Sequence, residues 1–109
     1  MAWIYGGGFL ISGGTLLYSG STIVTQSISW ETPVIFVTFN WRLGALGFSL
    51  SDDATSADIL NLCLKDQRLA LRWIQDSIKA FGDDASKVRP LPSTSQYTLD
   101  ADNDYLSCR

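Results

Sequence analysis

Histidine is absent from this sequence of 109 residues. A reaction that needs an imidazole base from this chain is therefore excluded, as is a metal site built on histidine. Cysteine is scarce, because only Cys63 and Cys108 occur, and this pair is too small for a disulfide framework and has no metal-ligand spacing. We expect no bound metal ion, and nothing in the sequence predicts a cofactor.

Positive charge is also low, since 8 lysines and arginines are outnumbered by 11 acidic residues and the net charge is −3. The basic residues do not cluster, so the chain is not expected to bind nucleic acid or an anionic membrane. No stretch approaches the roughly 18 uninterrupted apolar residues of a membrane-spanning helix. The first residues lack the basic region of a signal peptide, so none is predicted, and the localisation stays open.

The apolar content, by contrast, is typical of a globular protein, with 46% hydrophobic and 17% charged residues. The length corresponds to one domain at most. Residues 1–5 are mostly apolar and predict a short buried strand. Residues 34–39 are all β-branched or aromatic and show no alternation, which indicates a strand covered on both faces in a parallel sheet.

A helix is predicted from about residue 59 to residue 81, because apolar residues recur there at helical spacing. The apolar stripe consists of Ala70, Trp73, Ile74, Ile78 and Phe81. Gly82 follows directly and suits a C-terminal cap. A buried strand, a loop and an amphipathic helix in this order predict an α/β fold.

The remaining segments are predicted to be largely irregular. Ser21 or Thr22 is a candidate N-cap for a helical turn through Thr25 to Ser27. Residues 44–56 are rich in glycine, serine and aspartate and predict a polar loop. Residues 89–109 begin with an Arg-Pro-Leu-Pro run and lack periodicity, so they are predicted to be a disordered tail outside the folded part.

Three consecutive glycines, Gly6, Gly7 and Gly8, follow the first predicted strand. Without Cβ atoms they can adopt left-handed dihedrals. One interpretation is a turn that reverses the chain. Another is a site at which N–H groups converge on an oxygen carrying negative charge. A nucleotide-binding loop is a third, but the triplet fits neither G-x-G-x-x-G nor the lysine-containing P-loop.

Four motifs in register carry a resemblance to a known family: W-I-Y-G-G-G-F at 3–9, N-W-R-L-G at 40–44 followed by Gly47 and Phe48, N-L-C-L-K-D-Q-R-L-A-L-R-W-I at 61–74, and residues 81–88. Over residues 1–88 the chain resembles a type-B carboxylesterase, the family of fungal lipases and cholinesterases. The resemblance implies a fragment of an α/β-hydrolase, with two core parallel strands, a long glycine-rich loop and one long amphipathic helix. Residues 1–88 are then a partial domain, and residues 89–109 an unrelated tail.

The resemblance also implies roles for individual residues. Gly7 and Gly8 match the glycines whose N–H groups donate to the tetrahedral intermediate of ester hydrolysis, so they are the expected oxyanion-hole residues. Four further residues are expected to be structural: Gly6, Asn40, Arg42 and Asp66. Arg42 and Asp66 are expected to form an ion pair between the loop after the second strand and the helix. Cys63 departs from the family pattern, which usually has glycine at that position.

The family's nucleophile elbow, G-x-S-x-G, should follow Val88, but Arg-Pro-Leu-Pro stands there and the motif occurs nowhere in the sequence. Ser49 lies in a similar run that lacks the closing glycine, and Ser93 and Ser95 stand beside prolines without glycine. An ester is the expected substrate of the full-length family member. This chain lacks the nucleophile, acid and histidine and is predicted to be inactive. The alternatives are a non-catalytic cholinesterase-like binding or adhesion module and a pseudogene product.

Overall fold

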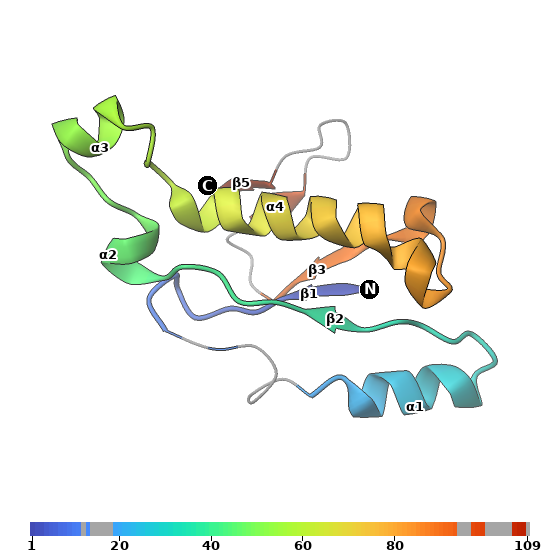
Figure 1. Cartoon of the computed structure of the whole chain (residues 1–109). Coiled ribbons are helices and arrows are strands. Elements are labelled where there is room, and N and C mark those ends of the chain that lie inside the picture. Colours follow the sequence, from blue (N-terminus) through green and yellow to red (C-terminus); the bar gives the residue numbers. More distant parts are fainter. Residues whose placement is uncertain (12, 14–18, 94–96, 100–105, 109) are drawn as a thin grey trace.

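The structure is a computed structural model, and it describes residues 1–11, 13, 19–93, 97–99 and 106–108 (Figure 1). Its centre is a small parallel sheet. Strand β1 (Ala2–Ile4) lies between β2 (Val37–Thr38) and β3 (Pro90–Pro92), and both neighbours run parallel to it. A central strand of a parallel sheet is covered on both faces. This explains why the first residues of the chain, which contain β1, are continuously apolar. The predicted α/β architecture is confirmed.

Strand β3 corrects the sequence interpretation, which placed everything after Val88 outside the folded part. The Ala2 N–H donates to the Arg89 carbonyl and the Ser93 N–H donates to the Ile4 carbonyl, both at 2.9 Å. Backbone groups alternate in direction along a strand, so those of Pro90 and Pro92 point away from β1. Proline is tolerated at such a free edge because no N–H is needed there.

The predicted helix is present as α4 (Leu62–Ser77), which continues as the 3-10 turn η1 (Ile78–Phe81). It ends where the sequence indicates, because Gly82 adopts a left-handed φ of 87° and its N–H donates to the Lys79 carbonyl at 3.1 Å. Short helices η2 (Ala85–Lys87) and α1 (Ser21–Ser29) complete the part around the sheet. None of the helices in the described part of the chain has the length and apolar character needed to cross a bilayer.

Helix α4 runs antiparallel to β1 across one face of the sheet (Figure 1). At its start, Cys63 packs in one core cluster with Ile4 and Tyr5. At its end, Ile74 and Ile78 pack in a second cluster with Ala2. The first of these clusters lies at the carboxyl end of the strands, where loops of an α/β fold commonly carry the functional groups.

Three other expectations differ from the structure. Strand β2 is shorter than the predicted 34–39, because the three-residue β1 is its sole partner in the described sheet. Helix α1 is longer than predicted and has Gly20 at its N-cap, without a side-chain cap from Ser21 or Thr22. The predicted loop 44–56 contains α2 (Gly44–Gly47) and α3 (Asp52–Ser56), where the Ser51 hydroxyl accepts the Ala54 N–H at 3.0 Å as an N-cap.

The end of the described chain contains β4 (Tyr97–Leu99) and β5 (Leu106–Cys108), which pair as an antiparallel two-stranded sheet. The domain boundary at Val88 and the unrelated origin of residues 89–109 stay predictions. Ser95 lies outside the described residues.

Candidate functional site

The glycine triplet forms a turn directly after β1. Gly7 and Gly8 have φ values of 137° and 62°, which residues with a Cβ rarely adopt. A Cβ built on Gly8 meets nothing within 4 Å, so the dihedral and not a lack of space selects glycine there. The Gly7 carbonyl accepts the N–H groups of Leu10 and Ile11 at 3.2 and 3.3 Å, which closes the turn.

The N–H groups of Gly7 and Gly8 are available to an external acceptor. Both glycines are exposed, and neither N–H donates a hydrogen bond to an acceptor in the described part of the chain. A backbone N–H group that is removed from water without a hydrogen-bond acceptor costs free energy, so a ligand that covers these groups is expected to accept from them. The turn therefore presents two adjacent unused donors at the carboxyl end of the central strand.

The strand end before the turn is held by the segment that follows β2. The ring of Tyr5 stacks on Trp41, with centroids 3.7 Å apart and planes 15° from parallel. The Tyr5 hydroxyl donates to Asn40 Oδ1 at 3.4 Å, and burial raises the pKa of the phenol, so it stays a neutral donor. Gly6 lies half-buried between this stack and the two donors.

The residue after the triplet, Phe9, is held by the same segment. Its carbonyl accepts the Gly44 N–H at 2.7 Å. Its ring meets Phe48 edge to face, with centroids 5.1 Å apart and an interplanar angle of 76°. Phe9, Gly44 and Phe48 all belong to motifs that carry the family resemblance, but the sequence did not predict their contact because Gly44 and Phe48 follow Phe9 by 35 and 39 positions.

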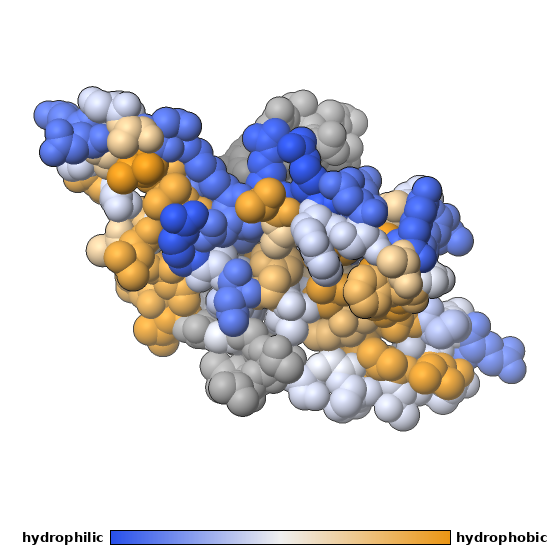
Figure 2. Space-filling view, viewed as in Figure 1, coloured by the Kyte–Doolittle hydropathy of each residue, from blue (hydrophilic) through white to orange (hydrophobic). Residues whose placement is uncertain are grey.

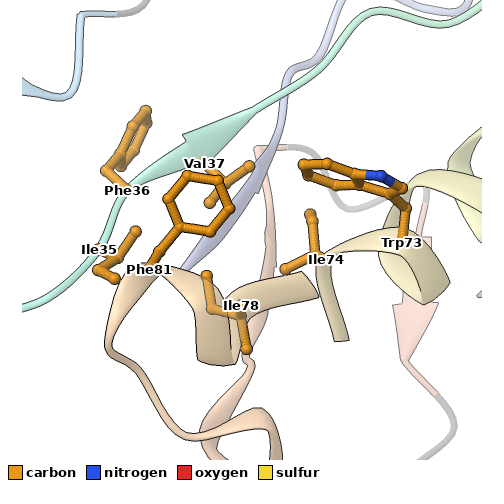
Figure 3. Close-up of a pocket in the computed structure, with 7 residues that line it drawn as sticks. All are labelled: Ile35, Phe36, Val37, Trp73, Ile74, Ile78 and Phe81. Carbon is orange, nitrogen blue, oxygen red and sulfur yellow. The ribbon is translucent and has the colours of Figure 1, made fainter. Parts of the chain in front are cut away.

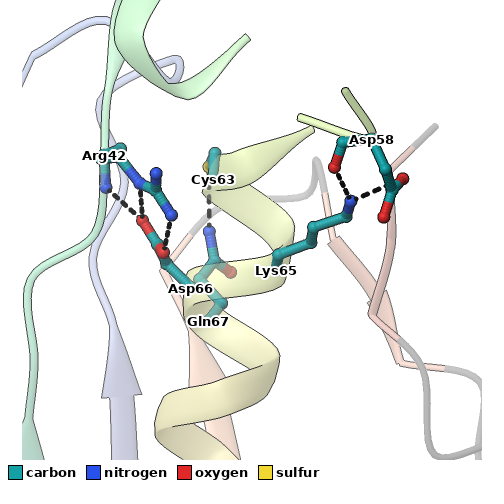
Figure 4. Close-up of polar contacts among 6 residues, drawn as sticks. All are labelled: Arg42, Asp58, Cys63, Lys65, Asp66 and Gln67. Carbon is teal, nitrogen blue, oxygen red and sulfur yellow. Dashed lines mark hydrogen bonds and ion pairs between the residues drawn. The ribbon is translucent and has the colours of Figure 1, made fainter. Parts of the chain in front are cut away.

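The expected ion pair between Arg42 and Asp66 is present (Figure 4). Asp66 Oδ2 accepts Arg42 Nε at 2.7 Å and the Arg42 backbone N–H at 3.0 Å, while Oδ1 accepts a second guanidinium N–H. These hydrogen bonds from Arg42 hold the pKa of the Asp66 carboxyl below its usual range. The pair fastens the post-β2 segment to α4, which supports the predicted structural role.

Helices α2 and α4 approach each other closely where Gly47 of α2 faces Cys63 of α4. Cys63 is fully buried, and its sulfur accepts Gln67 Nε2 at 3.3 Å (Figure 4). A Cβ on Gly47 would lie 2.5 Å from the Arg42 carbonyl oxygen and 3.1 Å from Cys63 Cβ. The Cys63 side chain therefore fits at this contact because Gly47 has no side chain.

Two of the serines considered in the sequence, Ser49 and Ser93, lie in the described part of the chain. The Ser49 hydroxyl donates to the Ala45 carbonyl at 3.1 Å within its own helical turn. Ser93 follows β3 at the same end of the sheet as the glycine turn, which the sequence did not indicate. No cluster of three or more His, Cys, Asp or Glu side chains that could hold a metal occurs within the described ranges.

A second feature is an apolar groove of about 260 Å³ between the β2 segment and the end of α4 (Figure 3). Figure 2 shows the hydrophobic surface on this side of α4, whose outer side is hydrophilic. The lining residues are Ile35, Phe36, Val37, Trp73, Ile74, Ile78 and Phe81. The groove adjoins the amino end of β1 and contains no titratable side chain, so it is separate from the glycine turn.

Comparison with known proteins identifies the family of the chain. A family model described as "Carboxylesterase family" matches residues 1–90. The chain is 48% identical over 86 residues to "Secreted lipase 1" of Botryotinia fuckeliana, covering 79% of this chain and 15% of that protein. It is 37% identical over 91 residues to "Inactive carboxylesterase-like protein VdtD" of Byssochlamys spectabilis, covering 81% of this chain and 15% of that protein.

A solved structure gives the same result. The crystal structure of Aspergillus niger EstA matches 86% of this chain with a TM-score of 0.72 and 34% sequence identity, and the chain covers 18% of that structure. The 109 residues thus span less than a fifth of the length of these relatives. The chain belongs to the carboxylesterase family and has part of the α/β-hydrolase fold.

Proposed function

We propose that residues 1–88 are the oxyanion-hole part of a carboxylic-ester hydrolase, in which Gly7 and Gly8 donate their N–H groups to the substrate. The observation that supports this is the pair of exposed, unused N–H groups at the end of β1. Both glycines have positive φ values, 137° and 62°. Donors fixed in advance stabilise the charge that develops in a transition state, and each is worth ~10²–10³ in rate.

In such a reaction, a nucleophile oxygen bonds to the ester carbonyl carbon, and the carbonyl electron pair moves to oxygen. The resulting oxyanion accepts hydrogen bonds from the two glycine N–H groups. As the carbonyl re-forms, its bond to the alkoxy oxygen breaks, and that oxygen takes up the proton that the nucleophile gave to a base elsewhere in the full-length protein. Gly7 and Gly8 act on the oxyanion alone and exchange no proton with the substrate. An ester is therefore the proposed substrate of a full-length protein that carries this segment.

We further propose that the 109-residue chain by itself does not hydrolyse esters. Its sequence has no histidine and no G-x-S-x-G motif. Loss of the serine or histidine of a catalytic triad costs on the order of 10⁶ in turnover even in an intact site. Ser93 lies near the glycine turn, but no imidazole of this chain can activate it.

Two measurements on the purified chain test its inactivity. Hydrolysis of an aryl acetate should equal the buffer background, and a fluorophosphonate should leave the mass of the chain unchanged. A full-length carboxylesterase serves as the positive control. Turnover that an organophosphate abolishes would contradict the proposal, and a Ser93→Ala variant would then show whether Ser93 is the labelled residue.

The oxyanion role is tested in a chimera in which residues 1–88 replace the matching segment of an active full-length relative. Gly8→Ala should lower kcat ~10²-fold, because alanine resists the left-handed φ that aims the N–H. Gly13→Ala is the matched control, since its Cβ also meets nothing within 4 Å and no left-handed φ is required there. Equal kcat values for both variants would refute the assignment.

A second candidate function is that of a non-catalytic family member, which the "inactive" relative of Byssochlamys spectabilis favours. In that case the segment contributes to a binding or adhesion module. The chimera separates the two functions. A folded chimera that retains the host's serine, acid and histidine but hydrolyses no ester would favour the non-catalytic role.

A further inference from the structure

We propose that Phe9 is the positioning residue of the glycine turn, and that its contacts with Gly44 and Phe48 hold the N–H groups of Gly7 and Gly8 in place. The effect on catalysis rests on the proposed oxyanion function, whereas the positioning itself rests on the contacts of Phe9 alone. Phe9 touches no substrate in this proposal. It acts through the two glycines that precede it.

The backbone of Phe9 shows that its surroundings determine its conformation. Its φ of 64° lies in the left-handed region, which a phenylalanine adopts at a steric cost. Such a conformation persists where neighbouring contacts impose it. Two contacts do so here: the 2.7 Å hydrogen bond from the Gly44 N–H and the edge-to-face packing on Phe48.

The other end of the turn is anchored to the same segment. Tyr5 stacks on Trp41, so the residues on both sides of the triplet are held by residues 40–48. That segment is in turn tied to α4 through Arg42 and Asp66. Gly6, Gly7 and Gly8 are therefore a span of three residues between two fixed ends.

The contacts at the two ends of the turn restrict the orientation of the glycine N–H groups, which the glycines themselves cannot do. A glycine has no side chain to restrict its dihedrals, so an unanchored triplet samples many N–H orientations. Oxyanion stabilisation depends on donors that already point at the developing charge. If the contacts of Phe9 are lost, the backbone dihedrals of Gly8 should no longer be restricted, and its N–H should vary in direction.

The first test measures backbone dynamics in the ¹⁵N-labelled full chain. The order parameters of the Gly7 and Gly8 amides should be near 0.85 in the wild type, roughly the value of rigid backbone, and fall below about 0.6 in Phe9→Leu and in Phe48→Leu. The Gly44 amide should lose its protection from hydrogen exchange in the same variants. Phe81→Leu is the control, because this exposed ring lines the groove at the other end of α4. Unchanged order parameters in Phe9→Leu would overturn the proposal.

The second test uses the chimera and decides the question if the isolated chain does not fold. Phe9→Leu should lower kcat by up to ~10²-fold with KM unchanged, since small displacements of catalytic groups cost about this much. Phe9→Tyr retains the ring and should restore the wild-type kcat. If Phe9→Leu leaves kcat unchanged while Gly8→Ala lowers it, the positioning proposal is wrong. If the amides become mobile and neither variant affects kcat, the oxyanion function is wrong and the positioning stands.

Discussion

At the scale of single residues, Gly8 is selected by its backbone dihedral angle, whereas Asp66 acts through its charge. Gly8 has space for a side chain, yet its φ of 62° favours glycine. Asp66 contributes through hydrogen bonding: its carboxylate accepts both the guanidinium and the backbone N–H of Arg42. The lowered pKa of this carboxyl connects the stability of the folded chain to pH.

We predict that the folded state loses stability as the pH falls and that Asp66→Asn removes part of this loss. The folded pKa of Asp66 lies below the unfolded value of about 3.9. The folded chain therefore binds fewer protons near that pH. The stabilisation is present above the unfolded pKa and disappears as the pH falls through the folded pKa. Denaturant unfolding at several pH values between neutral and acid measures it.

Asp58→Asn provides the control for this prediction because it removes the same charge. Asp58 pairs with Lys65 at 2.9 Å, but its side chain is 94% exposed. Exposed ion pairs contribute little to stability. The unfolding curves of Asp58→Asn should follow those of the wild type at each pH. The same behaviour in Asp66→Asn would show that the Arg42 pair does not stabilise the fold.

At the scale of elements, helix α4 packs against both ends of strand β1. Its start packs against the residues that hold the glycine turn, and its end packs against the amino end of β1. Helix α2 approaches α4 so closely that a Cβ on Gly47 would lie 3.1 Å from Cys63 Cβ, and it would also lie 2.5 Å from the Arg42 carbonyl oxygen. The segment that anchors Phe9 and Tyr5 is therefore itself part of a tight helix contact.

We predict that Gly47→Ala destabilises the fold by ~1–3 kcal/mol, as expected for overpacking a tight contact. The new methyl group would lie 2.5 Å from a backbone oxygen, which cannot move like a flexible side chain. Helix propensity alone predicts the opposite sign, because alanine is favoured over glycine inside a helix. Chemical denaturation measures the change. Gly13→Ala, with no atom within 4 Å of its Cβ, should be close to neutral; equal effects would rule out the contact as the cause.

At the scale of the whole molecule, the described part leaves much apolar surface uncovered. Trp73 and Phe81 belong to the predicted apolar stripe of the helix, yet they are 57% and 64% exposed beside the groove. Strands β2 and β3 each have one edge without a partner in the described sheet. Free edges and exposed apolar faces promote association between chains.

We therefore predict that the isolated chain self-associates as its concentration rises. The double variant Trp73→Arg with Phe81→Arg should shift sedimentation toward the monomer, because it places charge on the groove. Leu69→Arg changes an equally exposed residue of the same helix outside the groove and serves as the control. A soluble monomer with a sharp cooperative melt at every concentration would contradict this prediction.

The features that depend on local sequence pattern could be predicted without the structure. The apolar period predicted the helix, and its end at Gly82 is confirmed by the left-handed dihedral. The motifs identified the family, the glycine turn and the ion pair of Arg42 with Asp66. Each of these signals lies within a few residues or in a motif of fixed spacing.

The contacts between distant segments could not be predicted, because they depend on packing across the fold. Strand β3 exists because Arg89 and Ser93 find backbone partners on β1, and a pattern of two prolines gives no sign of this. The contacts of Phe9 with Gly44 and Phe48 are likewise formed across the fold. Periodicity reports which side of an element is apolar, but pairing and exposure depend on which partners the chain brings to that side. The sequence therefore specified the glycines of the turn, and the packing of residues 40–48 determined how their N–H groups are held.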